Sequence, residues 1–99
     1  MTINIQSVHF DADRKLIKFV TEKVEKLGHF QDDIISSEVT LKLEKSSTSE
    51  NKVAEIRLLI PGNDLFAKRR CKTFEESVDT SVSALRAQIQ KHKDKVRQV

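Results

Sequence analysis

Three consecutive runs of alternating apolar and polar residues fill the middle of this chain of 99 residues, and they constrain its fold more than any other feature. The runs cover residues 37–45, 54–60 and 64–71. Alternation with period two places every second side chain on the same face of a β-strand, so each run predicts a strand. The side chains expected to face the core are Val39, Leu41 and Leu43 in the first run and Ala54, Ile56, Leu58 and Ile60 in the second.

The connections between these runs are short and carry turn residues. Residues 46–51, with the sequence SSTSEN, are polar and predict a hairpin loop. The sequence IPGN at residues 60–63 fits a type II turn, because Pro61 fixes φ at the second position and Gly62 accepts a positive φ at the third. We therefore expect an antiparallel meander. Residues 2–8 alternate around Ile3 and Ile5, which predicts a fourth strand that joins the sheet parallel to a neighbour.

Two segments have helical periodicity instead. The first begins after Asp13, which is preferred to Asp11 as the N-cap, and Gly28 is well placed to end it. Its expected buried stripe consists of Leu16, Ile17, Val20, Val24 and Leu27.

The second helix is predicted over residues 73–97. Thr73 and Glu76 have the spacing of a capping box, in which each side chain accepts a hydrogen bond from the backbone N–H of the other residue. Its expected inner face consists of Phe74, Val78, Ser81, Val82, Leu85, Ile89 and His92.

The predicted order of elements is β-α-β-β-β-α, which corresponds to the α+β class. Two helices should cover one face of a four-stranded, mostly antiparallel sheet. A chain of this length supports one modest core, so we expect residues 1–99 to form a single domain.

The charge of the chain is unevenly distributed. The net charge is +3, yet residues 1–66 hold 9 Lys/Arg against 11 Asp/Glu, and residues 67–99 hold 9 against 4. Such asymmetry suggests a polyanionic partner, with nucleic acid first and an anionic membrane surface second. The chain has no Trp and no Tyr, so an aromatic platform for stacking a series of bases is hard to build.

Several function classes lack the residues that they need. The three histidines have no partner at metal-ligand spacing, and two glycines cannot form a phosphate-cradling loop. The adjacent Asp32 and Asp33 point apart rather than forming an acid/base pair. Cys71 is flanked by basic residues but has no candidate general base, and a single cysteine excludes an internal disulfide and fits a reducing cytoplasm. No export signal or membrane-spanning run is visible. We expect a cytoplasmic protein that is not an enzyme and uses no cofactor, metal or small-molecule substrate.

Basic residues gather in three places. They are the flank of the first helix with Lys15, Lys23 and Lys26, the run at residues 68–72 that includes Arg69 and Arg70, and the second helix with Arg86, Lys91, Lys93, Lys95 and Arg97. Helices packed side by side would present these charges as one cationic ridge, which would contact phosphates and sense backbone shape. The alternative is a solvated charged surface that only solubilises the protein.

Four stretches also resemble a known family. They are MTINI at the start, VTEKVEKL with Lys23 and Lys26, PGNDLFA at the turn into the last strand, and TFEESVDTSVSALRAQIQKHKDK with Gln88, Lys91 and Lys93. Over its whole length the chain resembles the short ribosome hibernation factors, also called ribosome-associated inhibitors or sigma-54 modulation-like proteins.

The resemblance implies a fold similar to double-stranded-RNA-binding domains and a monomer when free. It also implies binding to rRNA of the small ribosomal subunit, in the channel of mRNA and tRNA anticodon stems, which silences translation during starvation or stationary phase. The rRNA-facing residues that it implies are Lys23, Lys26, Lys91, Lys93 and Lys95.

The chain departs from the family pattern at four positions. Ala84 and Ala87 stand where basic residues are common, and Arg86 is displaced from them. Thr73 replaces an Asp cap, and Glu75 stands where an aromatic residue is common. Two alternatives remain open, a free-standing module for structured RNA and a protein-interaction regulator of transcription, whereas membrane association ranks last.

Overall fold

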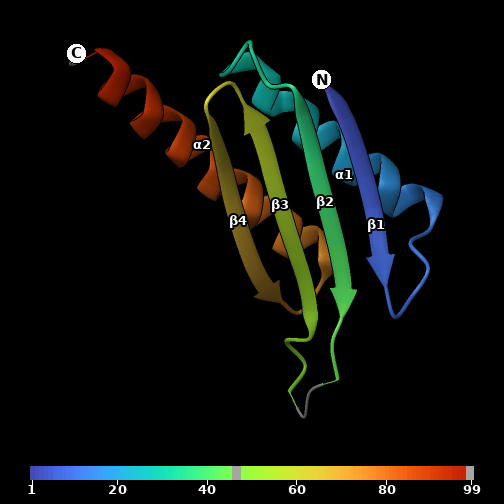
Figure 1. The fold of residues 1–99 in the computed structure, drawn as a ribbon. Coiled ribbons are helices and arrows are strands. Elements are labelled where there is room, and N and C mark those ends of the chain that lie inside the picture. Colours follow the sequence, from blue (N-terminus) through green and yellow to red (C-terminus); the bar gives the residue numbers. More distant parts are fainter. Residues whose placement is uncertain (46–47, 98–99) are drawn as a thin grey trace.

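The order of elements follows the sequence prediction. The computed structural model describes residues 1–45 and 48–97, and for residues 96 and 97 the backbone only. Its elements are β1 (Thr2–Val8), α1 (Arg14–Glu25), a short 3-10 helix η1 (Lys26–His29), β2 (Ser36–Leu43), β3 (Lys52–Ile60), β4 (Asn63–Cys71) and α2 (Phe74–Arg97), as shown in Figure 1.

The four strands form one sheet in the order β1-β2-β3-β4. β1 pairs with β2 in parallel, whereas β2 with β3 and β3 with β4 are antiparallel, which confirms both the predicted meander and the parallel first strand. The predicted hairpin loop includes residues 46 and 47, which lie outside the described residues. At its base, Leu43 pairs with Lys52 and the Glu44 N–H donates to the Asn51 carbonyl at 3.0 Å.

The connection between β3 and β4 is the tight turn that the sequence predicts. Ile60 pairs with Asn63 across it, and Gly62 has φ 77°. An L side chain adopts this region of φ only with strain, so glycine is required here by backbone conformation. A Cβ at Gly62 would meet no atom within 4 Å, so a lack of space does not contribute.

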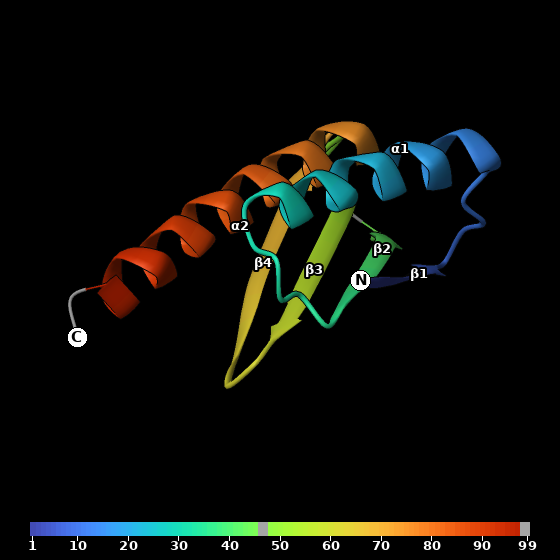
Figure 2. The ribbon, with the colours of Figure 1, turned by 90° about the horizontal axis from the view of Figure 1, so that it is seen from above.

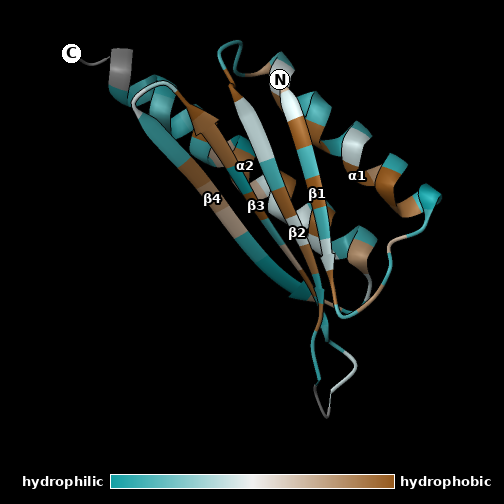
Figure 3. Ribbon diagram, turned by 45° about the vertical axis from the view of Figure 1, so that its right-hand side comes forward, coloured by the Kyte–Doolittle hydropathy of each residue, from teal (hydrophilic) through white to brown (hydrophobic). Residues whose placement is uncertain are grey.

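Both helices cover the same face of the sheet, which leaves the opposite face open (Figure 2). Apolar residues recur along the strands and the helices (Figure 3). The core lies between these two layers and draws buried residues from both helices and from the strands. Its strand contribution is Val39, Leu41, Ala54, Ile56, Leu58, Ile60, Leu65 and Ala67, and the expected Leu43 is partly buried against them. The predicted alternation is therefore confirmed.

α1 differs from the prediction in two respects. Ile17 is 41% exposed rather than buried, because α2 packs against the flank of α1 that carries Phe19 and Lys23 and leaves the flank of Ile17 uncovered. Gly28 does not cap the α-helix, which ends at Glu25 and continues as η1. The Leu27 carbonyl accepts from the N–H groups of Phe30 and Gln31, at 3.0 and 3.1 Å, so the turn closes without a left-handed glycine. The predicted N-cap is confirmed, since Asp13 Oδ1 accepts from the Leu16 N–H at 2.8 Å.

α2 begins as predicted and continues past the edge of the sheet. Thr73 Oγ1 accepts a hydrogen bond from the Glu76 N–H at 3.1 Å, which is one half of the expected capping box. Of its predicted inner face, Phe74, Val78, Ser81, Leu85 and Ile89 are buried, whereas Val82 and His92 are partly buried. Its last turns extend beyond the strands (Figures 1 and 2). We call residues 90–97 the overhang. Neither this helix nor any other in the described part of the chain is long and apolar enough to cross a membrane.

Candidate nucleic-acid interface

Lys23 lies at the junction of the two helices. Its Nζ is 3.0 Å from Oδ1 of Asp79 on α2, and it lies 5.5 Å from the centroid of the Phe19 ring. The side chain is 30% exposed, so this cation is neither free nor fully accessible. Lys23 therefore joins α1 to α2, and its positive charge is partly compensated by Asp79.

Lys15 and Lys26 lie at opposite ends of the first helical segment. Lys15 borders a hollow between the starts of α1 and α2, together with the acidic residues Asp11, Asp13 and Glu75. Lys26 is the first residue of η1 and is exposed. The ridge that the sequence predicts is thus interrupted by carboxylates at the end of the helical layer where α1 and α2 begin.

Arg86 rests on an aromatic ring. Its guanidinium carbon lies 4.3 Å from the centroid of the Phe30 ring, in the segment that follows η1. Lys93 lies on the same flank of α2 as Arg86. Phe30, Arg86 and Lys93 together line part of one hollow. Sequence reasoning did not identify Phe30, because no periodicity connects an irregular segment with a helix more than fifty residues later.

Lys91 and Lys95 lie on the other flank of α2. They border a hollow together with His92, Gln88 and the turn residues Gly62 and Asn63. No carboxylate of the described residues forms an ion pair with Lys91, Lys93 or Lys95. The overhang thus presents unpaired cations on two sides of one helix.

Gln88 fixes α2 to the edge of the sheet. Its Nε2 donates to the Phe66 carbonyl at 2.7 Å, and its Oε1 accepts from the Phe66 N–H at 3.3 Å. Phe66 belongs to β4, whose outer edge has no neighbouring strand. The amide therefore satisfies both backbone groups of one edge residue and sets where the overhang leaves the sheet.

The basic run at residues 68–72 does not form one patch. The pairing register places Arg69 opposite Ala54, on the helix-covered side of the sheet, whereas Arg70 lies opposite Val53 on the open side. Arg70 forms an ion pair with Glu44. The sequence contained the signal for this division, because consecutive residues of a strand point to opposite faces.

The open face of the sheet balances its own charges. Lys42 Nζ lies 2.7 Å from Glu55 Oε2, and Arg57 lies 3.6 Å from Asp64. The hydrogen bond to Glu55 and the negative charge of that carboxylate raise the pKa of the Lys42 ammonium above its ordinary value. Because Lys42, Arg57 and Arg70 are paired with carboxylates, most of the positive charge on this face is already compensated, and it offers less to a polyanion than the overhang does.

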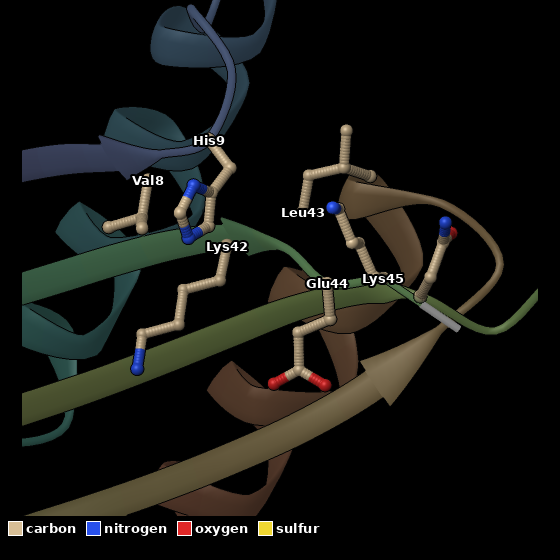
Figure 4. Close-up of a pocket in the computed structure, with 7 residues that line it drawn as sticks. Val8, His9, Lys42, Leu43, Glu44 and Lys45 are labelled. Atoms are coloured by element: carbon tan, nitrogen blue, oxygen red, sulfur yellow. The ribbon is translucent and has the colours of Figure 1, made fainter.

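A separate hollow of about 990 Å³ lies at the end of the sheet away from the overhang (Figure 4). It is lined by Val8, His9, Lys42, Leu43, Glu44, Lys45 and Asn51. Lys42 and Glu44 are already committed to Glu55 and Arg70, so two of the three Lys and Glu side chains in its lining are not free to bind a ligand. In the described part of the chain, no three His, Cys, Asp or Glu side chains gather where they could hold a metal ion.

Comparison with known proteins connects this arrangement to a family. Residues 3–97 match the model of the family described as "Sigma 54 modulation protein / S30EA ribosomal protein". Proteins named ribosome hibernation promoting factor from Klebsiella oxytoca and from Escherichia coli (strain K12) are each 30% identical over 98 residues, which is 99% of this chain and 99% of each relative. The protein of the same name from Pseudomonas putida is 30% identical over 95 residues, covering 96% of this chain and 89% of the relative.

Two solved structures share the fold. The crystal structure of the Thermus thermophilus Protein Y N-terminal domain has a TM-score of 0.79 at 20% identity and covers 93% of this chain and 99% of its own. A ribosomal subunit interface protein from Coxiella burnetii has a TM-score of 0.84 at 18% identity and covers 95% of this chain and 99% of its own. These likenesses confirm the α+β fold. On the match of its sequence from residue 3 to residue 97, the chain belongs to the sigma 54 modulation protein / S30EA ribosomal protein family.

Proposed function

We propose that this protein is a non-enzymatic translation inhibitor that acts in the cytoplasm. It binds the small ribosomal subunit as a monomer, through rRNA in the channel that mRNA and tRNA anticodon stems occupy, and promotes ribosome hibernation under stress. The relatives named ribosome hibernation promoting factor match this chain from end to end, which supports extending their named role to it.

The observation that carries the proposal is the overhang of α2. Lys91 and Lys95 lie on one flank of this helix and Lys93 lies on the other. These ammonium groups have no carboxylate partner among the described residues, so they are available to displace counterions from phosphates.

The shape of the molecule also favours a passage lined by RNA. The principal extents are 47 × 25 × 18 Å, and the overhang lies at one end of the long dimension (Figure 1). A helix with cations on two sides can meet phosphates on opposite walls at once, whereas a flat cationic patch meets only one. Phosphate contacts position the protein without reading sequence, which agrees with the lack of Trp and Tyr.

The test is co-sedimentation with purified small subunits in a sucrose gradient at several salt concentrations. Replacement of Lys91, Lys93 and Lys95 together by Glu should release the protein from the subunit. Each phosphate contact that is lost should reduce the slope of log affinity against log salt by about one. The control is the triple replacement of Lys45, Lys52 and Lys68 by Glu, which changes the net charge equally at the other end of the sheet.

The outcomes separate the alternatives. Equal release by both triple variants would show that net charge alone governs binding and would contradict the proposed surface. Tight binding to an isolated RNA duplex with none to subunits would favour a free-standing RNA module, and binding that survives ribonuclease would favour a protein-interaction regulator. Occupation of the channel is tested by competition, because subunits loaded with mRNA and tRNA should exclude the protein.

A further inference from the structure

Arg86 differs from the other cations of the helical layer in how it is held. Its guanidinium carbon lies 4.3 Å from the centroid of the Phe30 ring, within the range of cation–π contacts. The side chain is exposed, and no described residue gives its guanidinium an ion pair or a hydrogen bond. The guanidinium therefore lies close over the Phe30 ring, and its charge is not compensated by a carboxylate of the described residues.

A second stacked arginine on the open face of the sheet provides the contrast. Arg57 lies 5.1 Å from the centroid of the Phe66 ring, but its Nη1 is also 3.6 Å from Asp64 Oδ2. The register places Glu38 directly opposite Arg57 as well. Arg57 is thus compensated by carboxylates in a way that Arg86 is not.

The surroundings of Arg86 leave room for a flat group. The hollow beside it measures about 390 Å³, and its lining includes Phe30, Ser83, Arg86, Ala87, Gln90 and Lys93. This volume lies at the lower end of the roughly 300–1,000 Å³ that small-ligand sites occupy. Ser83 and Ala87 are small, so these two lining residues take up little of the space beside the guanidinium.

We propose that Arg86, supported by Phe30, is the stacking site for one unpaired nucleobase of the bound RNA. The base lies against the outer face of the guanidinium, and Lys93 at the rim of the same hollow meets the adjoining phosphate. The site rests on the proposed function, because it assumes that the helical layer faces RNA. It adds contact with a base to a surface that otherwise meets phosphates.

A base fits this site better than a phosphate alone does. A guanidinium that lies over a ring has its N–H groups directed toward the edges, and its remaining exposed surface is a flat π-face. Arginine planes accept unstacked bases of single-stranded RNA on such faces. A phosphate would be bound as well by lysine, whereas a stacked base requires the planar group.

This difference between arginine and lysine gives the experiment. Binding of the full chain to purified small subunits is measured for the unaltered protein, Arg86→Lys and Phe30→Leu over a series of salt concentrations. Arg86→Lys keeps the charge and removes the plane, so affinity should fall on the order of tenfold while the salt slope stays unchanged. Phe30→Leu should produce the same loss, because Arg86 then has no ring to hold it flat.

Two further measurements make the result specific. The matched variants Arg57→Lys and Phe66→Leu make the same chemical changes on the open face and should leave affinity unchanged. Chemical probing of the subunit RNA should reveal one unpaired base that the unaltered protein protects and Arg86→Lys exposes, with protection of the neighbouring backbone retained. If Phe30→Leu does not fold by circular dichroism, the exposed Arg86→Lys substitution carries the test.

The outcomes distinguish this site from the proposed function. If Arg86→Lys binds subunits as tightly as the unaltered protein and leaves every base protected, the stacking site is wrong while subunit binding stands. If the unaltered protein does not bind small subunits, the proposed function fails and the site fails with it.

Discussion

Replacement of Gln88 by Ala should destabilise the protein by removing its two hydrogen bonds to the Phe66 backbone. Their lengths are 2.7 and 3.3 Å. A hydrogen bond contributes a net of about 1 kcal/mol, so two contribute about 2 kcal/mol. Alanine recovers about 0.4 kcal/mol of helix propensity, which leaves a loss of about 1.5 kcal/mol. For a domain of this size, that loss lowers Tm by about 6–12 °C.

The matched control is Gln90→Ala on the same helix. Gln90 has the same side chain and is exposed, and its Nε2 donates to Asp94 Oδ1 at 3.1 Å within the overhang. The helix-propensity gain is identical in the two variants, and the exposed bond from Gln90 to Asp94 contributes only about 0.2–0.5 kcal/mol, so Gln88→Ala should have the clearly lower Tm because it also loses the contact with β4. The chain has no Trp or Tyr, so unfolding is followed by far-ultraviolet circular dichroism. Equal Tm values for the two variants would refute the role assigned to Gln88.

A third variant separates the donor from the acceptor. At neutral pH, Gln88→Glu can still accept from the Phe66 N–H, but it presents a carboxylate oxygen to the Phe66 carbonyl. It should be less stable than Gln88→Ala near pH 7 and should recover stability as the new carboxyl group is protonated. A pH-independent difference between these two variants would contradict the geometry.

Three further perturbations have defined outcomes. Gly62→Ala should lower the free energy of unfolding by about 1 kcal/mol, because alanine is strained at a φ of 77°. No neighbouring atom obstructs a Cβ, so backbone strain is the whole effect, and denaturant unfolding that shows no loss would contradict this reasoning. Glu55 raises the pKa of Lys42, so the pair stabilises the fold at neutral pH. This contribution to the free energy of unfolding is lost as pH rises through the folded-state pKa of Lys42. Glu55→Gln should therefore remove this loss of stability at alkaline pH from a pH titration of stability. Asp79→Asn should free Lys23 and increase the salt slope of subunit binding by up to about one, and an unchanged slope would show that Lys23 faces no phosphate.

Strand positions followed directly from the sequence because the open face of the sheet is polar. Glu38, Thr40 and Lys42 alternate with Val39 and Leu41 for that reason, and the predicted strand boundaries agree with the structure to within two residues. A sheet covered on both faces would have lost this alternation.

The errors in α1 came from tertiary packing. An apolar stripe indicates which face of a helix is buried but not how far burial extends to either side, and the position of α2 decided that for Ile17. Gly28 fits a helix end by composition, yet the bonds to the Leu27 carbonyl close the turn first. Neither outcome follows from the residues of α1 alone.

The candidate site was predictable in position but not in its contacts. The sequence analysis assigned Lys91, Lys93 and Lys95 to the second helix, and the four-residue spacing of Lys91 and Lys95 is enough to put these two on one flank and Lys93 on the other. The pairing of Lys23 with Asp79 and the stacking of Arg86 on Phe30 join residues far apart in the sequence, so no local pattern indicates them. These two contacts determine that the charge of Lys23 is partly compensated and that Arg86 lies over an aromatic ring.

The separation of charge along α2 has a kinetic consequence. The helix begins with Glu75 and Glu76 and ends in the cationic overhang, so in the field of a polyanion the molecule experiences a torque as well as an attraction. Its cationic end is turned toward the target before contact, which shortens the rotational search that limits most associations. If the target is the RNA of the proposed function, the acidic start of α2 therefore raises the rate of binding by orienting the molecule, and this contribution falls as salt screens the field.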